Sequence, residues 1–286
     1  MLHNNKAILL ISSPDKEGLV YKVTEFIFIH KGNLLHAEQH IDKETNYFFM
    51  RLEFEIANSE LDKATLLAQL EPIKQQYNMN IQLFFREEPQ KVAIFTSKTD
   101  HCLYDLLIKN KSEELQFNPC CIISNHQNTQ SIAEHFHIPF HHIPVIHEYK
   151  KEAEATQLKI LAEYKVNLIV LARYMQVLGP DFVSQYNRQI INVHHSFLPA
   201  FVGADPYKQA YNRGVKIIGA TSHYTTNILD EGPIIEQKVV RVNHKDNLEG
   251  FIRKGKELEK QVLSYAVNKH LQNKILVFEN KTVVFD

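Results

Sequence analysis

The first third of the chain, from about residue 6 to residue 86, alternates hydrophobic and polar positions in a way that predicts six elements. Their order is strand, helix, strand, strand, helix, strand. The clearest element is the strand 47–56, where apolar residues alternate with charged ones and predict one buried face and one solvent face. The first helix follows a turn at 13–18, and we expect it to end at Gly32. The predicted elements are strand 7–11, helix 19–29, a hairpin of 33–41 and 47–56, helix 61–76 and strand 80–85.

The rest of the chain shows a different pattern, in which short apolar strands alternate with amphipathic helices. A charged, proline-containing linker at 86–91 separates the two patterns. Alternation of this kind favours a mostly parallel sheet covered on both faces, with a ligand crevice at the carboxyl ends of its strands. The expected strands are 92–96, 119–124, one near 140, 168–171, 190–193, 215–224, 233–240, 275–278 and 282–285; the expected helices are 100–109, 129–136, 151–164 and 247–270.

Length and element order together predict an α/β protein of two domains, because 286 residues exceed one typical domain. The first, residues 1–86, has the βαββαβ order of a ferredoxin-like fold. The second, residues 91–286, is expected to be Rossmann-like.

Composition narrows the possible partners and the compartment. A net charge of -1 without charged blocks gives no sign of a nucleic-acid partner, and no segment resembles a signal peptide or a membrane span. Three cysteines in no disulfide pattern fit a reducing cytoplasm. The histidines between 135 and 147 lack a recognised metal-ligand spacing, so we interpret them as surface and loop residues. No metal and no cofactor are expected.

Three polar residues suggest acyl chemistry. Asn192 and His194 lie at the end of the strand 190–193, where alternation puts them on the same side. Asp230 lies in a polar loop before the next apolar strand. An amide donor, an imidazole and a carboxylate together can stabilise an oxyanion and move protons. A single Asn or His at such a position is more often a hydrogen-bonded structural residue, so the combination carries the prediction.

The sequence resembles the folate-dependent formyl-transfer enzymes at these positions. The matching motifs are Asn-x-His-x-Ser-x-Leu-Pro from Asn192 and Asp-x-Gly-Pro-Ile-Ile from Asp230. The resemblance implies that Asn192, His194 and Asp230 form the catalytic set. It extends over the whole chain in the form of the formyltetrahydrofolate deformylases, which join an ACT domain to a formyltransferase-like domain; the matching stretches are 101–107, 194–201 and 214–221.

Two features favour a deformylase over a transferase. His195 stands where the transferases have proline. The turn 96–101 contains no glycine, whereas glycinamide ribonucleotide transformylase binds its acceptor's phosphate at a glycine-rich loop there. Methionyl-tRNA formyltransferase is disfavoured by the absence of a basic face. Two rivals remain: a transferase that passes the formyl group to an amine such as glycinamide ribonucleotide, and a non-catalytic sensor of folate or amino acids.

The resemblance implies hydrolysis of 10-formyltetrahydrofolate, a substrate, to formate and tetrahydrofolate. This reaction supplies formate for purine synthesis and balances the one-carbon folate pools. Gln176 stands where the family usually has arginine, and Asp205 where a basic residue is expected. The role of His195 stays open between orienting water and a structural hydrogen bond. The implied substrate-binding residues are Arg173, Met175, Gln176, Val177, Leu178, His195, Ser196 and His223.

The turn that opens the first helix resembles that of ACT domains. The resemblance implies a homo-oligomer with an amino-acid effector bound near Asp15, Gly18 and Asn33. A helix N-terminus after a glycine suits a carboxylate. A purely structural ferredoxin-like module is the alternative.

Overall fold

The computed structural model describes residues 6–56, 62–85, 89–200 and 205–286. Contacts between residues divide the chain into two compact units. The first contains residues 1–89 together with 272–278 and 283–286, and the second contains 90–271 and 279–282. The predicted linker residues 86–88 and Phe201 lie outside the described residues. Within the described part of the chain, no helix combines the length and the apolar character that a membrane crossing requires.

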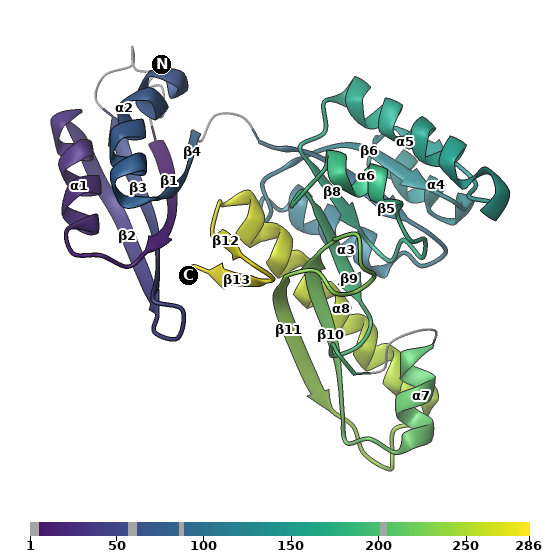
Figure 1. The fold of residues 1–286 in the computed structure, drawn as a ribbon. Helices are drawn as coiled ribbons and strands as arrows, with labels where there is room; N and C mark the ends of the chain where they lie inside the picture. Colours follow the sequence, from purple (N-terminus) through teal and green to yellow (C-terminus); the bar gives the residue numbers. More distant parts are fainter. Residues whose placement is uncertain (1–5, 57–61, 86–88, 201–204) are drawn as a thin grey trace. The chain divides into compact units, whose positions relative to one another are not determined.

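The N-terminal unit has the predicted element order. Its four strands form one antiparallel sheet in the order β2-β3-β1-β4, and both helices cover the same face of that sheet (Figure 1). This is the ferredoxin-like arrangement that the sequence predicts. The elements are β1 (Lys6–Pro14), α1 (Leu19–Ile29), β2 (Gly32–Asp42), β3 (Tyr47–Ile56), α2 (Lys63–Tyr77) and β4 (Asn80–Phe85).

The end of α1 differs from the expectation. The residue in the left-handed conformation is Lys31, with φ 54°, while Gly32 begins β2. Gly32 has a packing role, because a Cβ there would lie 2.8 Å from Cγ2 of Ile27. Glycine is therefore needed for close approach of strand and helix, and a lysine takes the backbone conformation that we had assigned to glycine.

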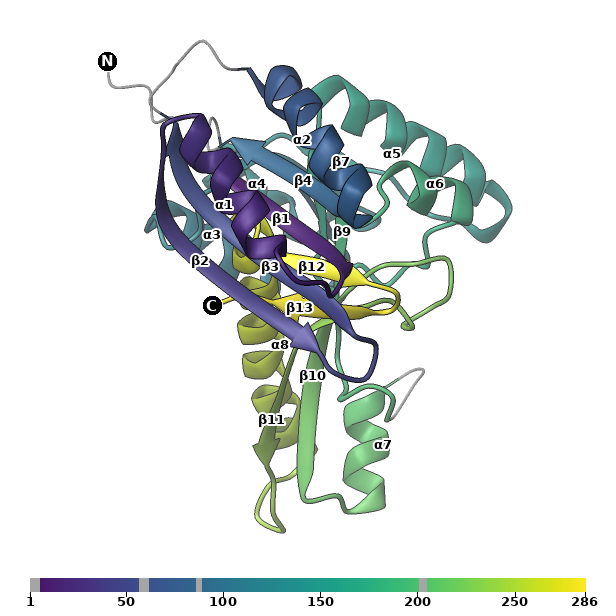
Figure 2. The same ribbon diagram turned by 60° about the vertical axis from the view of Figure 1, so that its left-hand side comes forward.

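The predicted alternation along β3 is only partly right. Arg51 was expected on the solvent face, yet it is 2% exposed, and Phe49 on the same face is 1% exposed. The cause is the C-terminal hairpin of β12 (Ile275–Phe278) and β13 (Lys281–Val284). Leu276 and Phe285 pack on Phe49 and Leu10 in one cluster, and Nε of Arg51 donates to the carbonyl oxygen of Asn273 at 3.1 Å. Both faces of this sheet are thus covered (Figure 2).

The second unit contains a seven-stranded sheet in the order β11-β10-β9-β8-β5-β6-β7. The strands from β9 to β7 are parallel, and β10 and β11 are antiparallel to their neighbours, so the sheet is mostly parallel as predicted. The strands are β5 (Lys91–Thr96), β6 (Asn118–Ser124), β7 (Phe140–His142), β8 (Leu168–Leu171), β9 (Ile190–His194), β10 (Ile217–Tyr224) and β11 (Ile234–Arg241).

Helices pack against this sheet at close to the predicted positions, but two were missed. These two are short and begin with proline, which suits the first position of a helix because it has no N–H to leave unpaired. Their apolar positions are too few to show a period. The helices are α3 (His101–Lys111), α4 (Gln130–His135), α5 (Lys150–Tyr164), α6 (Pro180–Gln185), α7 (Pro206–Arg213) and α8 (Leu248–Leu271), of which α6 and α7 were missed.

The terminal hairpin yields a prediction about stability. Phe285→Ala should lower the free energy of unfolding of the N-terminal unit by about 3–5 kcal/mol, because Phe285 is 1% exposed and its removal leaves a cavity. Hydrogen exchange at the β1 and β3 amides of the full chain measures this. The matched control is Phe28→Ala, which removes a ring that is 80% exposed on α1. Equal exchange rates in both variants would contradict the structural role of the hairpin.

Candidate active site

Asn192 and His194 occupy the carboxyl end of β9, and β10 supports both from one side. The antiparallel register places His223 opposite Asn192 and Thr221 opposite His194. Nδ2 of Asn192 lies 3.1 Å from Nε2 of His223. Asn192 and His194 therefore point to the same side of the sheet, as the strand alternation predicts. His223, expected as a substrate contact, is 2% exposed and also contacts the candidate catalytic groups.

Asp230 reaches this side of the sheet from the loop between β10 and β11. Its Oδ2 lies 3.1 Å from Nδ1 of His194, and its Oδ1 lies 3.6 Å from Nε2 of His223. The backbone of Asp230 is left-handed, with φ 57°. The loop approaches β10 closely because position 232 is glycine: a Cβ there would lie 1.7 Å from the carbonyl oxygen of Tyr224. Nδ2 of Asn280 braces the loop by donating to the carbonyl oxygen of Glu231 at 2.9 Å.

The charge of Asp230 is set by two opposing effects. Burial by itself raises the pKa of this carboxyl, but the hydrogen bonds from His194 and His223 outweigh burial and lower the pKa below its usual value. Asp230 is therefore ionised at neutral pH. It accepts from Nδ1 of His194, which fixes the orientation of that ring and leaves Nε2 as its other polar atom.

The remaining donors fit a ligand that carries a carbonyl group. Nε2 of His194 is buried and has no partner among the described residues. Nδ1 of His223 donates to the carbonyl oxygen of Tyr224 at 2.9 Å, and its Nε2 lies near both the amide of Asn192 and the carboxylate of Asp230. Among the described residues the amide nitrogen of Asn192 has no further partner, so at least one of its two hydrogens is free to bind a ligand. An amide donor and an imidazole beside one carboxylate can stabilise a tetrahedral oxyanion and transfer protons.

These groups line a cavity of about 320 Å³. The segment 173–178 forms one wall, and the predicted substrate residues Arg173, Met175, Gln176, Val177 and Leu178 all belong to it. Met175 and Val177 are 55% and 52% exposed, so apolar side chains face the opening. His195 and His223 line the cavity too. The segment 225–229 also forms part of the lining and was not predicted, because it carries no motif other than its position before Asp230.

Ser196 is the one predicted substrate residue that does not line this cavity. Its Oγ donates to the carbonyl oxygen of Ala200 at 2.6 Å. Its own carbonyl oxygen accepts from Oγ1 of Thr221 at 2.8 Å, and Leu198 N donates to the same hydroxyl at 3.1 Å. Ser196 thus ties the turn after β9 to β10, so its role in this structure is to shape the loop beside His195.

A second polar cluster lies next to the cavity and was not predicted. Glu259 of α8 is 1% exposed, and its Oε2 accepts from Nε2 of His101 at 2.8 Å. Oε1 of Glu259 accepts from the hydroxyl of Tyr207 at 2.6 Å. Nε of Arg173 lies 3.5 Å from Oε2 of Glu259. Burial raises the pKa of Glu259, but His101, Arg173 and Tyr207 outweigh burial and lower it, so this carboxylate is ionised as well.

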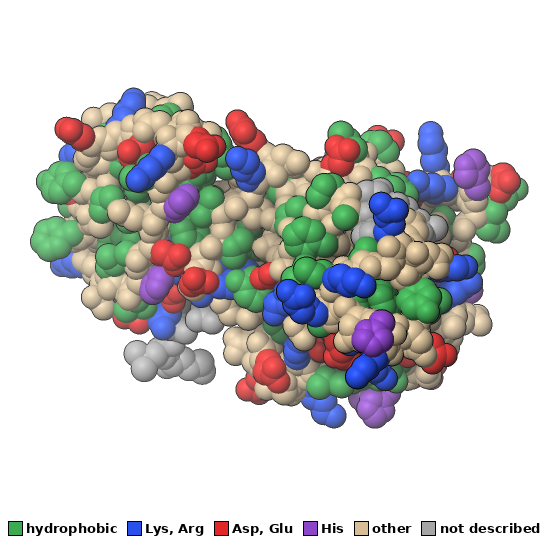
Figure 3. Space-filling model, turned by 90° about the horizontal axis from the view of Figure 1, so that it is seen from below, with side chains coloured by type: hydrophobic (Ala, Val, Ile, Leu, Met, Phe, Trp, Pro, Cys, Tyr) green, Lys and Arg blue, Asp and Glu red, His purple; other side chains and the backbone are tan. Residues whose placement is uncertain are grey.

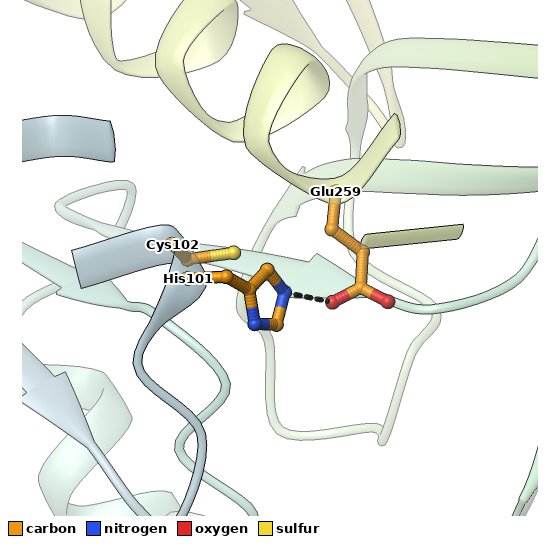
Figure 4. A group of neighbouring side chains, drawn as sticks. All are labelled: His101, Cys102 and Glu259. Carbon is orange, nitrogen blue, oxygen red and sulfur yellow. Dashed lines mark hydrogen bonds and ion pairs between the residues drawn. The ribbon is translucent and has the colours of Figure 1, made fainter. Parts of the chain in front are cut away.

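We considered a metal site in this cluster, because His101, Cys102 and Glu259 have their potential ligand atoms within 4.8 Å of one another. Figure 4 shows the His101 ring and the Glu259 carboxylate facing each other in a hydrogen bond. Burial holds the pKa of the Cys102 thiol well above its usual value, so it is not a thiolate. Glu259 is already paired with the guanidinium of Arg173, a cation. This donor set does not suit a metal ion.

The predicted effector residues lie apart within one chain. Gly18 precedes α1 with φ 86°, and Asp15 lies just before it, next to the end of β1. Asn33 is at the start of the edge strand β2, opposite Glu55 near the end of β3. The 11 residues of α1 separate these two places, a length of about 16 Å. One copy of the chain therefore does not bring the three residues together.

Asp205, where the family pattern has a basic residue, directly precedes α7, and its carbonyl oxygen accepts from the amides of Lys208 and Gln209.

The surface charges are mixed on the face that Figure 3 shows, where basic and acidic side chains are interspersed. This agrees with the net charge of -1. The visible face therefore offers no continuous basic surface of the kind that binds nucleic acid.

Comparisons with known proteins identify the relatives of this chain. Residues 90–267 match the formyl transferase family. Formyltetrahydrofolate deformylase from Synechocystis sp. is 48% identical over 284 residues, which are 99% of this chain and 100% of that protein. The deformylase from Bacillus subtilis is 46% identical and covers 99% of this chain and 95% of its own length.

Solved structures give the same relationship. The crystal structure of a formyltetrahydrofolate deformylase from Pseudomonas syringae superposes with a TM-score of 0.94 at 42% identity, and covers 100% of this chain and 96% of that one. A phosphoribosylglycinamide formyltransferase from Anaplasma phagocytophilum has a TM-score of 0.63 at 30% identity, and covers 68% of this chain and 93% of that one. The deformylases match this chain over both units, so this chain belongs to the formyltetrahydrofolate deformylase family.

Proposed function

We propose that this protein hydrolyses 10-formyltetrahydrofolate to formate and tetrahydrofolate. The observation that carries the proposal is the Asp230–His194 pair beside Asn192 on the wall of an open cavity. Relatives that match the whole chain are named for this reaction, which supports it. The non-catalytic alternative does not explain why an ionised, largely buried carboxylate orients an imidazole whose other nitrogen has no partner among the described residues.

In the proposed mechanism, the pterin lies against the segment 173–178, and the formyl group reaches Asn192 and His194. Water attacks the formyl carbon, and a C–O bond forms as the carbonyl becomes an oxyanion. Asn192 donates to this oxyanion, and a protonated His194 helps to stabilise it. Asp230 orients His194 and accepts, or relays, the proton from water. The bond from the formyl carbon to nitrogen 10 then breaks; one proton of water is transferred to that nitrogen, and the other leaves as formic acid ionises.

We also propose a wider role. Formate released here would serve purine synthesis, and hydrolysis would balance the one-carbon folate pools in the cytoplasm. The substrate carries the reacting group, so we expect no cofactor or metal to take part. The mechanism assigns every proton transfer to protein groups or water, which is consistent with this expectation.

For the N-terminal unit we propose an ACT domain that associates with a second copy and binds an amino acid. The separation of Gly18 and Asn33 within one chain supports a site shared by two copies. The edge strand β2 supports association, because no strand in the described part of the chain pairs with its outer side, and apolar side chains such as Leu34 and Leu35 are 41% and 42% exposed. The alternative is a domain that only joins subunits.

The first prediction tests the reaction. With 10-formyltetrahydrofolate and no acceptor, the protein should release formate stoichiometrically with tetrahydrofolate, because water is the acceptor. Added glycinamide ribonucleotide should be neither formylated nor bound, since the turn 97–101 lacks the glycines that let backbone amides approach phosphate. Formylglycinamide ribonucleotide produced as fast as formate would show the protein to be a transferase.

The second prediction concerns Asp230. Asp230→Asn should lower kcat by about 10²–10⁴-fold, because the amide cannot accept a proton or stabilise a protonated His194. The affinity for a non-reactive folate analogue should change little. The neighbouring Glu231→Gln is the matched control, since Glu231 is exposed and its side chain does not line the cavity with His194. If Asp230→Asn keeps most of its kcat at saturating substrate, Asp230 does not belong to the catalytic set.

The third prediction concerns regulation. The full chain should sediment at no less than twice its monomer mass of 33.3 kDa, and one member of a panel of amino acids should bind and change the rate of formate release. Asn33→Ala should weaken that binding without changing the basal rate. Calorimetry and kinetics across the panel measure both effects. If no amino acid binds and none alters the rate, the domain has only a structural role.

A further inference from the structure

The cluster around Glu259 lies at the place where a mostly parallel sheet normally holds its ligand. β9, β8 and β5 are adjacent, and each delivers one residue just beyond its carboxyl end. These residues are His195, Arg173 and, at the first position of α3, His101. Ligand crevices of open α/β sheets lie at this edge. Here these side chains of the protein fill part of that edge, and Glu259 of α8 pairs with two of them, His101 and Arg173.

The cluster is built so that Arg173 is fixed. Its backbone is left-handed, with φ 64°, a conformation that a non-glycine residue adopts rarely. Tyr207 can reach Glu259 only because Gly255, one turn earlier on α8, has no side chain: a Cβ there would lie 2.1 Å from the Tyr207 ring. The carboxylate is thus held by Tyr207 and His101, and it holds the guanidinium in turn.

The guanidinium keeps unused donors beside the catalytic wall. Nε and Nη1 of Arg173 are buried and have no hydrogen-bond partner among the described residues. Oε2 of Glu259 lies 3.5 Å from Nε, so the two groups form an ion pair but not a hydrogen bond. Arg173 lines the same cavity as Asn192, His194 and His195. The N–H groups of a guanidinium make strong, charge-assisted hydrogen bonds to a carboxylate. The carboxylate that this reaction forms is formate.

Arg173 also influences the neighbouring histidine. Burial first, and then Arg173, lower the pKa of His195 to about 3, and Glu259 raises it by less than Arg173 lowers it. His195 is therefore neutral. In the described part of the chain its ring contacts are with His194 and Tyr207. A neutral imidazole beside a cation can accept a hydrogen bond from water, whereas an ammonium group is disfavoured by the nearby charge.

We propose that Arg173, anchored by Glu259, determines which molecule accepts the formyl group. Its guanidinium binds the attacking water and then the formate that forms from it, and it disfavours an amine acceptor. This rests on the proposed function and adds to it the group that makes water the acceptor. The atoms balance as in the hydrolysis, because Arg173 stays protonated throughout and contributes only hydrogen bonds and charge. Arg173 is thus a binding and specificity residue, and Glu259 is a positioning residue.

The decisive variant is Arg173→Gly, because glycine adopts a φ of 64° without strain. Arg188→Gly is the matched control: Arg188 is an exposed arginine with φ 58° that does not line the cavity. Two quantities are measured on the full chain, namely the inhibition constant of formate and the partition of the formyl group between water and added glycinamide, a small amine probe. Calorimetry with sodium formate measures anion binding without turnover.

We expect Arg173→Gly to weaken formate inhibition by about tenfold or more and to raise the fraction of formyl groups on glycinamide by a similar factor. Arg173→Lys should recover part of both effects, since it keeps the charge. Arg188→Gly should match the wild type. If Arg173→Gly fails to fold in a thermal melt, Arg173→Gln gives the same two measurements with a side chain of similar length.

Two results would overturn the proposal. One is that the Arg173 variants keep the formate inhibition and the partition of the wild type. The other is that kcat falls while the inhibition constant of formate and the partition of the formyl group stay constant. Arg173 would then act on the formyl oxygen of the substrate and not on the choice of acceptor. Failure of the proposed function is a separate outcome: the wild type would then release no formate without an acceptor, while formate binding to the wild type and its loss in Arg173→Gly would still be measurable.

Discussion

The ionised carboxylate of Asp230 is the constraint on which the site depends. Its side chain is 10% exposed, and it stays charged because two imidazoles, His194 and His223, hydrogen bond to it. Each histidine comes from a different strand, β9 or β10, so the antiparallel pairing of these strands fixes the distance between the two rings. The loop that carries the carboxylate can approach only because Gly232 leaves the backbone of Tyr224 uncovered. Sheet register and one glycine therefore decide where this carboxylate lies.

Much of this could be predicted from the sequence, because the information is local. The alternation in 190–194 puts Asn192 and His194 on one side, and the motif around Asp230 identifies its partner. The βαββαβ order and the mostly parallel sheet follow from the hydrophobic periods. The structure confirms this order and the Rossmann-like arrangement of the second unit. It extends most elements by only a few residues at their ends.

What the sequence did not predict depends on contacts between distant segments. Arg51 was predicted to face solvent, and Phe49 lies on the same face of β3. Nothing in 47–56 shows that residues 276 and 285 cover that face. Glu259 looked like one more polar residue on a long helix, and its partners lie 52, 86 and 158 positions away in Tyr207, Arg173 and His101. Lys31 replaced the expected glycine in the left-handed conformation, since Gly32 was needed for packing against Ile27. Periodicity describes single elements, so it cannot show which surfaces meet.

Two carboxylates hold two neighbouring groups of the site. Asp230 contacts His194 directly and orients its ring. Glu259 holds the guanidinium of Arg173, and burial together with that cation lowers the pKa of His195 further than Glu259 raises it, so that His195 is neutral. One site consequently contains an imidazole that serves as a donor in the proposed mechanism and a second that is suited to accept a hydrogen bond. Addition of water to a carbonyl needs both, because the oxygen of the carbonyl gains negative charge while the water loses a proton. An amine acceptor would carry its own positive charge into the same space. The charge pattern around the two histidines therefore favours water over an amine.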